Sequence, residues 1–148
     1  MARRYDTVSF LTDWGLTDEF VGVVKAVIRD IAAHVTVIDL THGIAPFDVR
    51  AGSIALARSI SYLPTGIVLA VVDPGVGTAR RPVALRAARG DLLVGPDNGL
   101  LLPAARMLGG VTAAHELTAT ELFLDEPSST FHGRDIFAPV AAHLASGV

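Results

Sequence analysis

Short β-branched segments alternate with longer segments of helical periodicity in the first half of the sequence. Three of the short segments are expected to be strands: Thr7–Thr12, Val35–Leu40 and Gly66–Val72. Apolar residues at helical spacing predict helices over Asp18–His34 and Pro46–Leu63, the second capped by Asp48. This order requires right-handed crossovers, which place helices on both faces of a parallel sheet. We therefore expect an α/β fold, a three-layer domain with a mainly parallel sheet flanked by helices.

The alternation changes in the second half of the sequence. Two short apolar segments, PVALRAA and DLLVGP, flank Arg89-Gly90-Asp91 and predict a β-hairpin. A short helix is expected in LLPAARMLGG, a strand in VTAAHEL and a last helix in GRDIFAPVAAHLASG, with Pro139 in its first turn or two.

Composition limits the classes of function. With 148 residues, 51% of them apolar, the chain can bury the core of one ordinary domain. A charged fraction of 18% and a net charge of -3 give no basic surface for nucleic acid. No apolar run approaches the roughly 20 residues that a membrane span needs, and cysteine is absent. We expect a cytoplasmic protein with no nucleic acid or membrane partner.

Polar clusters follow each predicted strand of the first half, at TDWGLTDE, THGIAPFD and DPGVGTARR, and a fourth, STFHGRD, precedes the last helix. Ligands of open parallel sheets bind at the carboxyl ends of the strands. Asp13 and Asp18 in the first cluster are suited to accept hydrogen bonds from a ribose diol. For Asp18, capping of the following helix is the simpler interpretation.

Asp73, Arg80 and His132 are the strongest candidates for chemistry. Arg80 is always protonated and would favour the charged form of Asp73. Asp73 could then orient His132, leaving one imidazole nitrogen to hold or deprotonate a water molecule. A structural salt bridge beside an unrelated surface histidine is an equally open alternative.

The other polar residues are interpreted as structural. His34, His42, His115 and His143 fall in this class, and Asp97 and Asn98 are expected to form a turn. No GxGxxG precedes a helix, which argues against dinucleotide binding. The only lysine, Lys25, lies inside a predicted helix, so the lysine of a receiver domain is missing. A metal site built from Asp13, Asp73, His132 and Asp135 stays open, although no compact ligand spacing supports it.

Five ordered motifs carry a resemblance to a known family: SFLTDWGLTDEFVG, IDLTHGIAPFDV, VVDPGVGTARRPVAL, GPDNGLL and TFHGRDIFAPVAAHLASG. Together they resemble the N-terminal domain of the S-adenosylmethionine hydroxide adenosyltransferases, relatives of the fluorinase and chlorinase. The resemblance extends over essentially all of residues 1–148. It implies attack of water or hydroxide on ribose C5′ of S-adenosylmethionine, giving adenosine and L-methionine, with no metal or organic cofactor.

The resemblance also implies roles for individual residues. Asp73, Arg80 and His132 match the catalytic Asp-Arg-His set of the family. The substrate-binding positions would be Asp13 at the ribose hydroxyls, Phe47 at the ribose pocket, Asp18 at the methionine amino group, Gly75 and Gly77 at close backbone approaches, and Gly133 beside His132. In the halogenating relatives the position of Asp73 carries smaller or non-ionised residues, so a charged Asp73 favours the hydroxide branch.

The family resemblance implies more than this sequence contains. Its members continue into a C-terminal β-rich domain and form trimers, with sites between the N-terminal domain of one subunit and the C-terminal domain of the next. The sequence stops at Val148, about where that domain would begin, so we expect it to be absent. The alternatives to an enzyme of this type are a non-catalytic nucleoside-binding or interaction domain and, third, a metal-dependent hydrolase.

Overall fold

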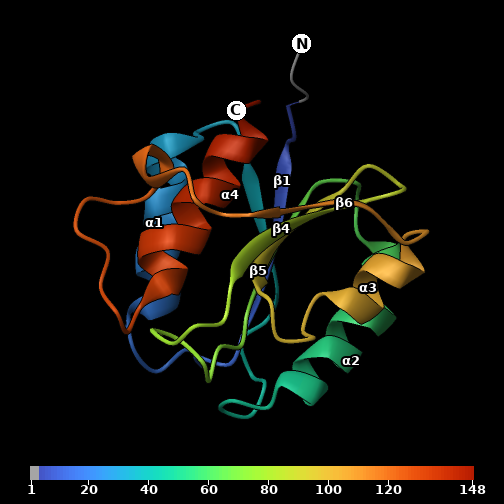
Figure 1. The fold of residues 1–148 in the computed structure, drawn as a ribbon, viewed down its shortest axis with the longest axis horizontal. Helices are drawn as coiled ribbons and strands as arrows, with labels where there is room; N and C mark the ends of the chain where they lie inside the picture. Colours follow the sequence, from blue (N-terminus) through green and yellow to red (C-terminus); the bar gives the residue numbers. More distant parts are fainter. Residues whose placement is uncertain (1–3) are drawn as a thin grey trace.

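The computed structural model describes residues 4–148 as six strands in one sheet between two layers of helices (Figure 1). The strands, in the spatial order β2-β1-β3-β5-β4-β6, are β1 (Thr7–Thr12), β2 (Thr36–Thr41), β3 (Ile67–Val71), β4 (Pro82–Ala87), β5 (Leu92–Pro96) and β6 (Val111–Glu116). Helices α1 (Phe20–Ile31) and α4 (Ala138–Ala145) pack together on one face, and α2 (Val49–Ser59) and α3 (Leu102–Met107) on the other. The expected three-layer α/β fold is confirmed.

The sheet is mainly parallel, as expected. Strands β2, β1, β3 and β5 run parallel to one another, whereas β4 is antiparallel to both β5 and β6. The predicted hairpin around Arg89-Gly90-Asp91 is confirmed, with Leu85 of β4 opposite Leu93 of β5. Within the described part of the chain, no helix is long and apolar enough to cross a membrane.

The core lies on both faces of the sheet. Successive residues of a strand point to opposite sides, so Phe10 packs into the cluster beneath α1 and α4 while Leu11 packs beneath α2 and α3. All five residues of β3, in the middle of the sheet, are buried. The burial of β3 on both faces explains why its sequence is a continuous apolar run.

The predicted helices form with small differences at their ends. Helix α1 begins at Phe20 rather than Asp18, and it ends at Ile31. The predicted cap of α2 is confirmed, because the Asp48 carboxylate accepts a hydrogen bond from the Ala51 amide at 2.9 Å. Two one-turn 3-10 helices, η1 (Ile60–Tyr62) and η2 (Thr120–Leu122), complete the connections.

The last helix differs from the expectation at its beginning. Residues Gly133–Phe137 form a π-helical turn, η3, in which the Ala138 amide donates to the Gly133 carbonyl, and only then does α4 begin. Pro139 has no amide to donate to the Asp135 carbonyl four residues before it. That carbonyl instead accepts the Leu124 amide at 2.9 Å. Wide turns of this kind are frequent at functional sites.

Candidate functional site

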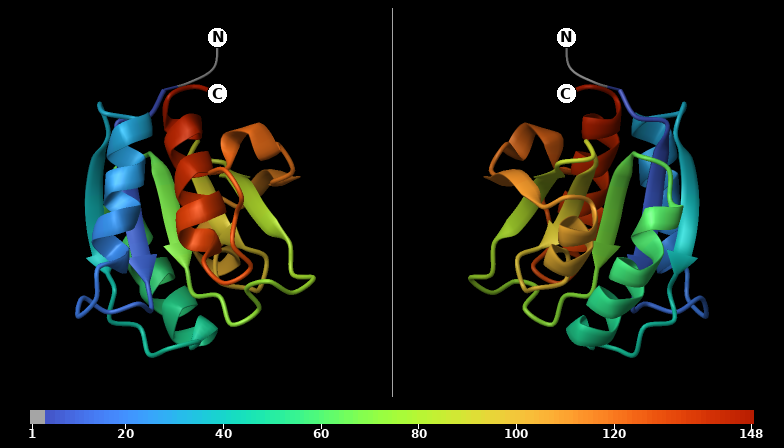
Figure 2. Two further views of the ribbon diagram at one scale, coloured as in Figure 1. Left: turned by 90° about the vertical axis from the view of Figure 1, so that its left-hand side faces the viewer. Right: turned by 90° about the vertical axis from the view of Figure 1, so that its right-hand side faces the viewer.

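The loops after β1, β2 and β3 and the loop before η3 gather at the end of the sheet away from the two termini (Figure 2). They enclose a cavity of about 620 Å³ at the carboxyl ends of the parallel strands. The cavity is lined by Asp13, Trp14, Asp18, Phe20, Pro46, Phe47, Val71, Asp73, Val76, Ser128, Thr130, Phe131, His132, Gly133 and Arg134. Six of the predicted site residues therefore line one cavity: Asp13, Asp18, Phe47, Asp73, His132 and Gly133.

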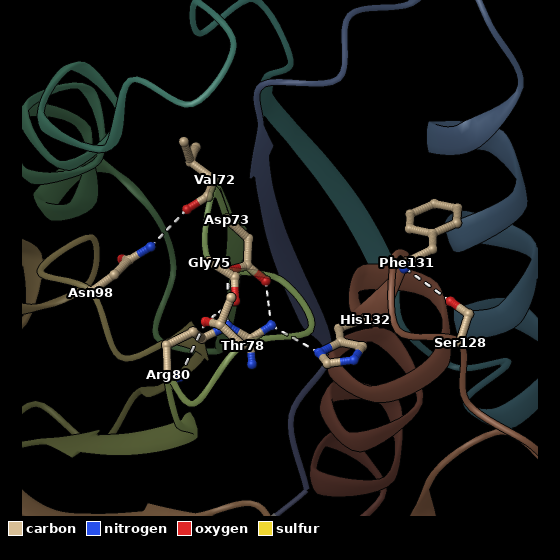
Figure 3. Close-up of polar contacts among 9 residues, drawn as sticks. All are labelled: Val72, Asp73, Gly75, Thr78, Arg80, Asn98, Ser128, Phe131 and His132. Atoms are coloured by element: carbon tan, nitrogen blue, oxygen red, sulfur yellow. Dashed lines mark hydrogen bonds and ion pairs between the residues drawn. The ribbon is translucent and has the colours of Figure 1, made fainter.

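Asp73, Arg80 and His132 form one contiguous hydrogen-bonded group (Figure 3). Arg80 Nε donates to Asp73 Oδ1 at 2.8 Å, and Arg80 Nη2 donates to both Asp73 Oδ2 and His132 Nδ1, the latter at 2.8 Å. The side chains of Arg80 and Asp73 are only 9% and 6% exposed. One of the two interpretations of the sequence had Asp73 orient His132. In the structure, Arg80 lies between them and makes that contact.

The hydrogen bond from Arg80 determines which nitrogen of His132 carries the proton. A guanidinium has donors only, so Nδ1 must be the acceptor and a neutral ring carries its proton on Nε2. Burial lowers the pKa of His132, and the nearby charge of Arg80 lowers it further, against opposing contributions from Asp73, Ser128 and Asp135. His132 is therefore neutral at pH 7, with Nε2–H as its donor.

Asp13 connects two of the loops around the cavity. Its Oδ2 accepts a hydrogen bond from the Phe47 amide at 2.7 Å. Phe47 adopts a φ of 64°, a left-handed conformation that is unfavourable for an aromatic residue. The Asp13 carboxylate offsets part of that strain, and Asp13 also lines the cavity. Phe47 itself is 65% exposed at the cavity mouth.

Asp18 contacts both the start of α1 and the cavity. Its Oδ1 accepts a hydrogen bond from the amide of Phe20, the first residue of α1, at 3.0 Å. Its side chain also lines the cavity. Stabilising the start of α1 and facing a ligand are compatible for a carboxylate with two oxygens.

The three predicted glycines differ in what they permit. A side chain on Gly75 would approach Arg80 Cγ at 3.1 Å, and Gly75 is not among the cavity-lining residues. Gly77 has a φ of +77°, and a side chain there would collide with the Ser129 carbonyl. Both glycines thus allow the β3–β4 loop to fold against Arg80 and the opposite loop. Gly133 lies against the Trp14 indole, where a Cβ would be 2.5 Å from Cζ2.

An aromatic wall of the cavity was not predicted. Trp14 contacts Phe131 edge to face with ring centroids 5.2 Å apart, and Phe131 contacts Phe20 at 4.8 Å. All three line the cavity, although 117 positions separate Trp14 from Phe131 in the sequence (131 minus 14). Only 6% of the residues are aromatic, so the presence of Trp14, Phe20 and Phe131 within the polar motifs was the sequence signal that could have predicted this wall.

Asp135 and Asn98 have structural partners. The Asp135 carboxylate accepts hydrogen bonds from Arg134 and from the Ser128 amide. Asn98 Nδ2 donates to the Val72 carbonyl at 2.9 Å, which ties the turn after β5 to the end of β3. Among residues 4–148, no three acidic, histidine or cysteine side chains are close enough together to hold a metal ion. The alternative ligand set of Asp13, Asp73, His132 and Asp135 is thus not assembled as one cluster.

Comparison with known proteins gives a family for this arrangement. The sequence model described as "SAM hydroxide adenosyltransferase N-terminal domain" matches residues 8–148. The chain belongs to the SAM hydroxide adenosyltransferase family. The family resemblance expected from the five motifs is confirmed.

Relatives in this family include both hydrolases and halogenating enzymes. The chain is 58% identical over 140 residues to an "(R)-S-adenosyl-L-methionine hydrolase" of Salinispora tropica, covering 95% of this chain and 53% of the relative. It is 32% identical over 163 residues to a fluorinase of Actinoplanes sp., covering 95% and 54%. A crystal structure of an uncharacterized conserved protein from Thermotoga maritima superimposes with a TM-score of 0.89 at 47% identity, covering 95% and 55%. The chain spans about half the length of these relatives.

Proposed function

We propose that the protein hydrolyses S-adenosylmethionine to adenosine and L-methionine. A water oxygen forms a bond to ribose C5′ while the C5′–S bond breaks and its electron pair stays on sulfur. One proton of the water is released, so the cationic substrate and water give two neutral products and a proton. The observation that carries this proposal is the Asp73–Arg80–His132 group beside the cavity at the carboxyl ends of the strands. A relative 58% identical to this chain is named "(R)-S-adenosyl-L-methionine hydrolase".

The charge of the cavity supports a cationic substrate. The carboxylates of Asp13 and Asp18 line it, and neither is ion-paired with a described residue. The other two charged groups of the lining are already paired, Asp73 with Arg80 and Arg134 with Asp135. The Trp14 and Phe131 rings add apolar surface with a negative face. A sulfonium is attracted both to carboxylates and to aromatic faces, the second by about 0.5–2 kcal/mol.

His132 supports the reaction as a donor rather than as a base. With Nδ1 occupied by Arg80, its remaining hydrogen-bonding group is Nε2–H. That group would hold the oxygen of the attacking water in line with the C–S bond.

The same group favours oxygen over halide as the nucleophile. A halide beside His132 would also lie near the buried Asp73 carboxylate, whose charge repels it. Arg80 Nε and Nη2 already donate to Asp73 and His132, so these donors are not available to a halide. Hydroxide and water differ from halides in that they also donate hydrogen bonds, which a carboxylate accepts.

No metal or organic cofactor is needed for this reaction. The sulfonium is already an excellent leaving group, so the main requirements are a positioned nucleophile and removal of bulk water. Extensive dialysis against a chelator should therefore leave the rate unchanged. A loss of activity restored by a divalent metal would contradict this part of the proposal and favour the metal-dependent alternative.

Assembly belongs to the same proposal. We infer from the family resemblance that the complete site lies between this domain and a C-terminal domain of a neighbouring subunit in a trimer. The chain spans about half of its relatives, which also keeps open a second candidate, a nucleoside-binding module without turnover. Binding of adenosine without hydrolysis of S-adenosylmethionine would favour that second function. A cytoplasmic location stays an expectation from the sequence.

The test is product formation by the purified chain and by a His132→Ala variant. The proposal predicts adenosine and methionine in equal amounts from S-adenosylmethionine, detected by chromatography. The variant should be at least about tenfold slower, because it loses the donor that holds the nucleophile. His143→Ala, a histidine in α4 that does not line the cavity, is the matched control. Inactivity of this chain alone would place the fault in the missing half of the pocket. No adenosine even after a C-terminal domain of the family is added, or full turnover by His132→Ala, would contradict the proposal.

A further inference from the structure

His42 is a buried histidine that the proposed reaction does not use. It follows β2 and is only 5% exposed. Its Nδ1 lies 2.8 Å from Thr12 Oγ1, and its Nε2 lies 2.8 Å from Asp39 Oδ1. The ring packs edge to face on Phe10, with centroids 4.8 Å apart. Because both nitrogens and one face have partners, the orientation of the ring is fixed.

The contacts of His42 lead to the first loop of the cavity. Thr12 Oγ1 also accepts a hydrogen bond from the Trp14 amide at 3.1 Å. The His42 carbonyl accepts one from the Gly15 amide at 2.7 Å. The backbone around Asp13 and Trp14 is thus held on one side through the His42 ring and on the other through its carbonyl. His42 itself does not line the cavity.

The direction of these hydrogen bonds is consistent along the whole chain of contacts. Thr12 accepts the Trp14 amide with its oxygen and can give its own proton to Nδ1 of His42. Nε2–H then donates to Asp39, whose other oxygen accepts from Lys25 at 2.8 Å. Burial tends to raise the pKa of Asp39, but the hydrogen bonds from His42 and Lys25 outweigh it and hold the pKa below its ordinary value. Asp39 is therefore a charged acceptor that fixes this direction.

We propose that His42 is a positioning residue that sets Trp14 and Asp13 for substrate binding. It acts through Thr12 and does not touch the substrate. The inference rests on the proposed function for its substrate, S-adenosylmethionine. Its geometric part, the control of Trp14 by His42, stands independently of that function.

Two substitutions separate the contacts of the ring. The amide of His42→Asn can occupy the place of Nδ1 and keep the bond to Thr12. The longer His42→Gln can occupy the place of Nε2 and keep the bond to Asp39 while losing Thr12. If positioning runs through Thr12, the asparagine variant should resemble the unaltered protein and the glutamine variant should not.

Trp14 provides the readout, because it is the only tryptophan of the chain. In His42→Gln we expect a red-shifted Trp14 emission and stronger quenching by acrylamide. We also expect the KM for S-adenosylmethionine to rise about three- to tenfold, the value of one lost hydrogen bond, with a smaller change in kcat. Thr12→Val removes this link together with the acceptor of the Trp14 amide, so it should change Trp14 fluorescence at least as much.

His34→Ala is the control for a general loss of stability. His34 Nε2 contacts the carbonyls of Tyr5 and Ala145, at 3.1 and 3.3 Å, at the opposite end of the sheet. It should leave Trp14 fluorescence and KM unchanged. The inference is overturned if His42→Gln and Thr12→Val leave Trp14 fluorescence unaltered, or if His42→Asn or His34→Ala changes it as much as His42→Gln does. Absence of turnover even with a C-terminal domain of the family added would refute the proposed function, while the fluorescence result would still decide the positioning role.

Discussion

Removal of Arg80 should destabilise the protein strongly, because Arg80 neutralises a buried carboxylate. Arg80→Met keeps most of the apolar stem and removes the guanidinium, whose Cζ lies 5.3 Å from the Phe137 ring centroid. It leaves Asp73, with a side chain only 6% exposed, without its cation. Loss of one member of a buried ion pair costs about 3–5 kcal/mol of unfolding free energy. For a domain of this size that is a decrease in Tm of roughly 6–20 °C.

The assay is urea unfolding followed by circular dichroism, with two matched variants. Arg81→Met removes a neighbouring arginine whose pair with Asp97 is 66% and 47% exposed, so it should cost less than about 1 kcal/mol. Adding Asp73→Asn to Arg80→Met should recover about half of the loss, since the uncompensated charge is removed. The reasoning is refuted if Arg80→Met costs no more than Arg81→Met, or if the double variant is less stable than Arg80→Met alone.

Two further predictions concern the same cavity. The pKa of His132, followed by NMR, should lie below its ordinary value in the unaltered protein and rise in Arg80→Met. Because the lowered pKa means that the folded unaltered chain binds fewer protons than the unfolded one, its stability should fall as pH drops below about 6.5. An unchanged His132 pKa in the variant would contradict the assigned role of Arg80. Gly133→Ala would place a Cβ 2.5 Å from Trp14, so we expect a loss of about 1–3 kcal/mol and altered Trp14 fluorescence. Gly22→Ala, whose Cβ would meet nothing within 4 Å inside α1, should be neutral or stabilising, and equal behaviour of the two variants would argue against the close packing.

Local sequence patterns were sufficient for most of the fold. The β1 bounds, Thr7–Thr12, are those expected from the apolar run, and Asp48 caps α2 as its position before the helical pattern indicates. These features depend on residues close in sequence. The π-helical turn was not expected, because it depends on Pro139 and on a partner for the Asp135 carbonyl that comes from Leu124.

The candidate site was predictable only in part, for the same reason. Family motifs identified Asp73, Arg80 and His132, but not that Arg80 stands between the other two, since 52 positions separate Arg80 from His132. The role of Trp14 at the cavity wall and the burial of His42 also depend on contacts between loops distant in the sequence. Such contacts follow from strand order, which the local pattern leaves undetermined.

The most direct measurement of the central claim is the fate of the water oxygen. S-adenosylmethionine would be incubated with the protein in water enriched in the heavy oxygen isotope, and the products analysed by mass spectrometry. Attack of water at C5′ predicts one heavy oxygen in adenosine, at its 5′-hydroxyl, and none in methionine. Unlabelled adenosine, or a heavy oxygen at a position of the products other than the 5′-hydroxyl of adenosine, would contradict the account.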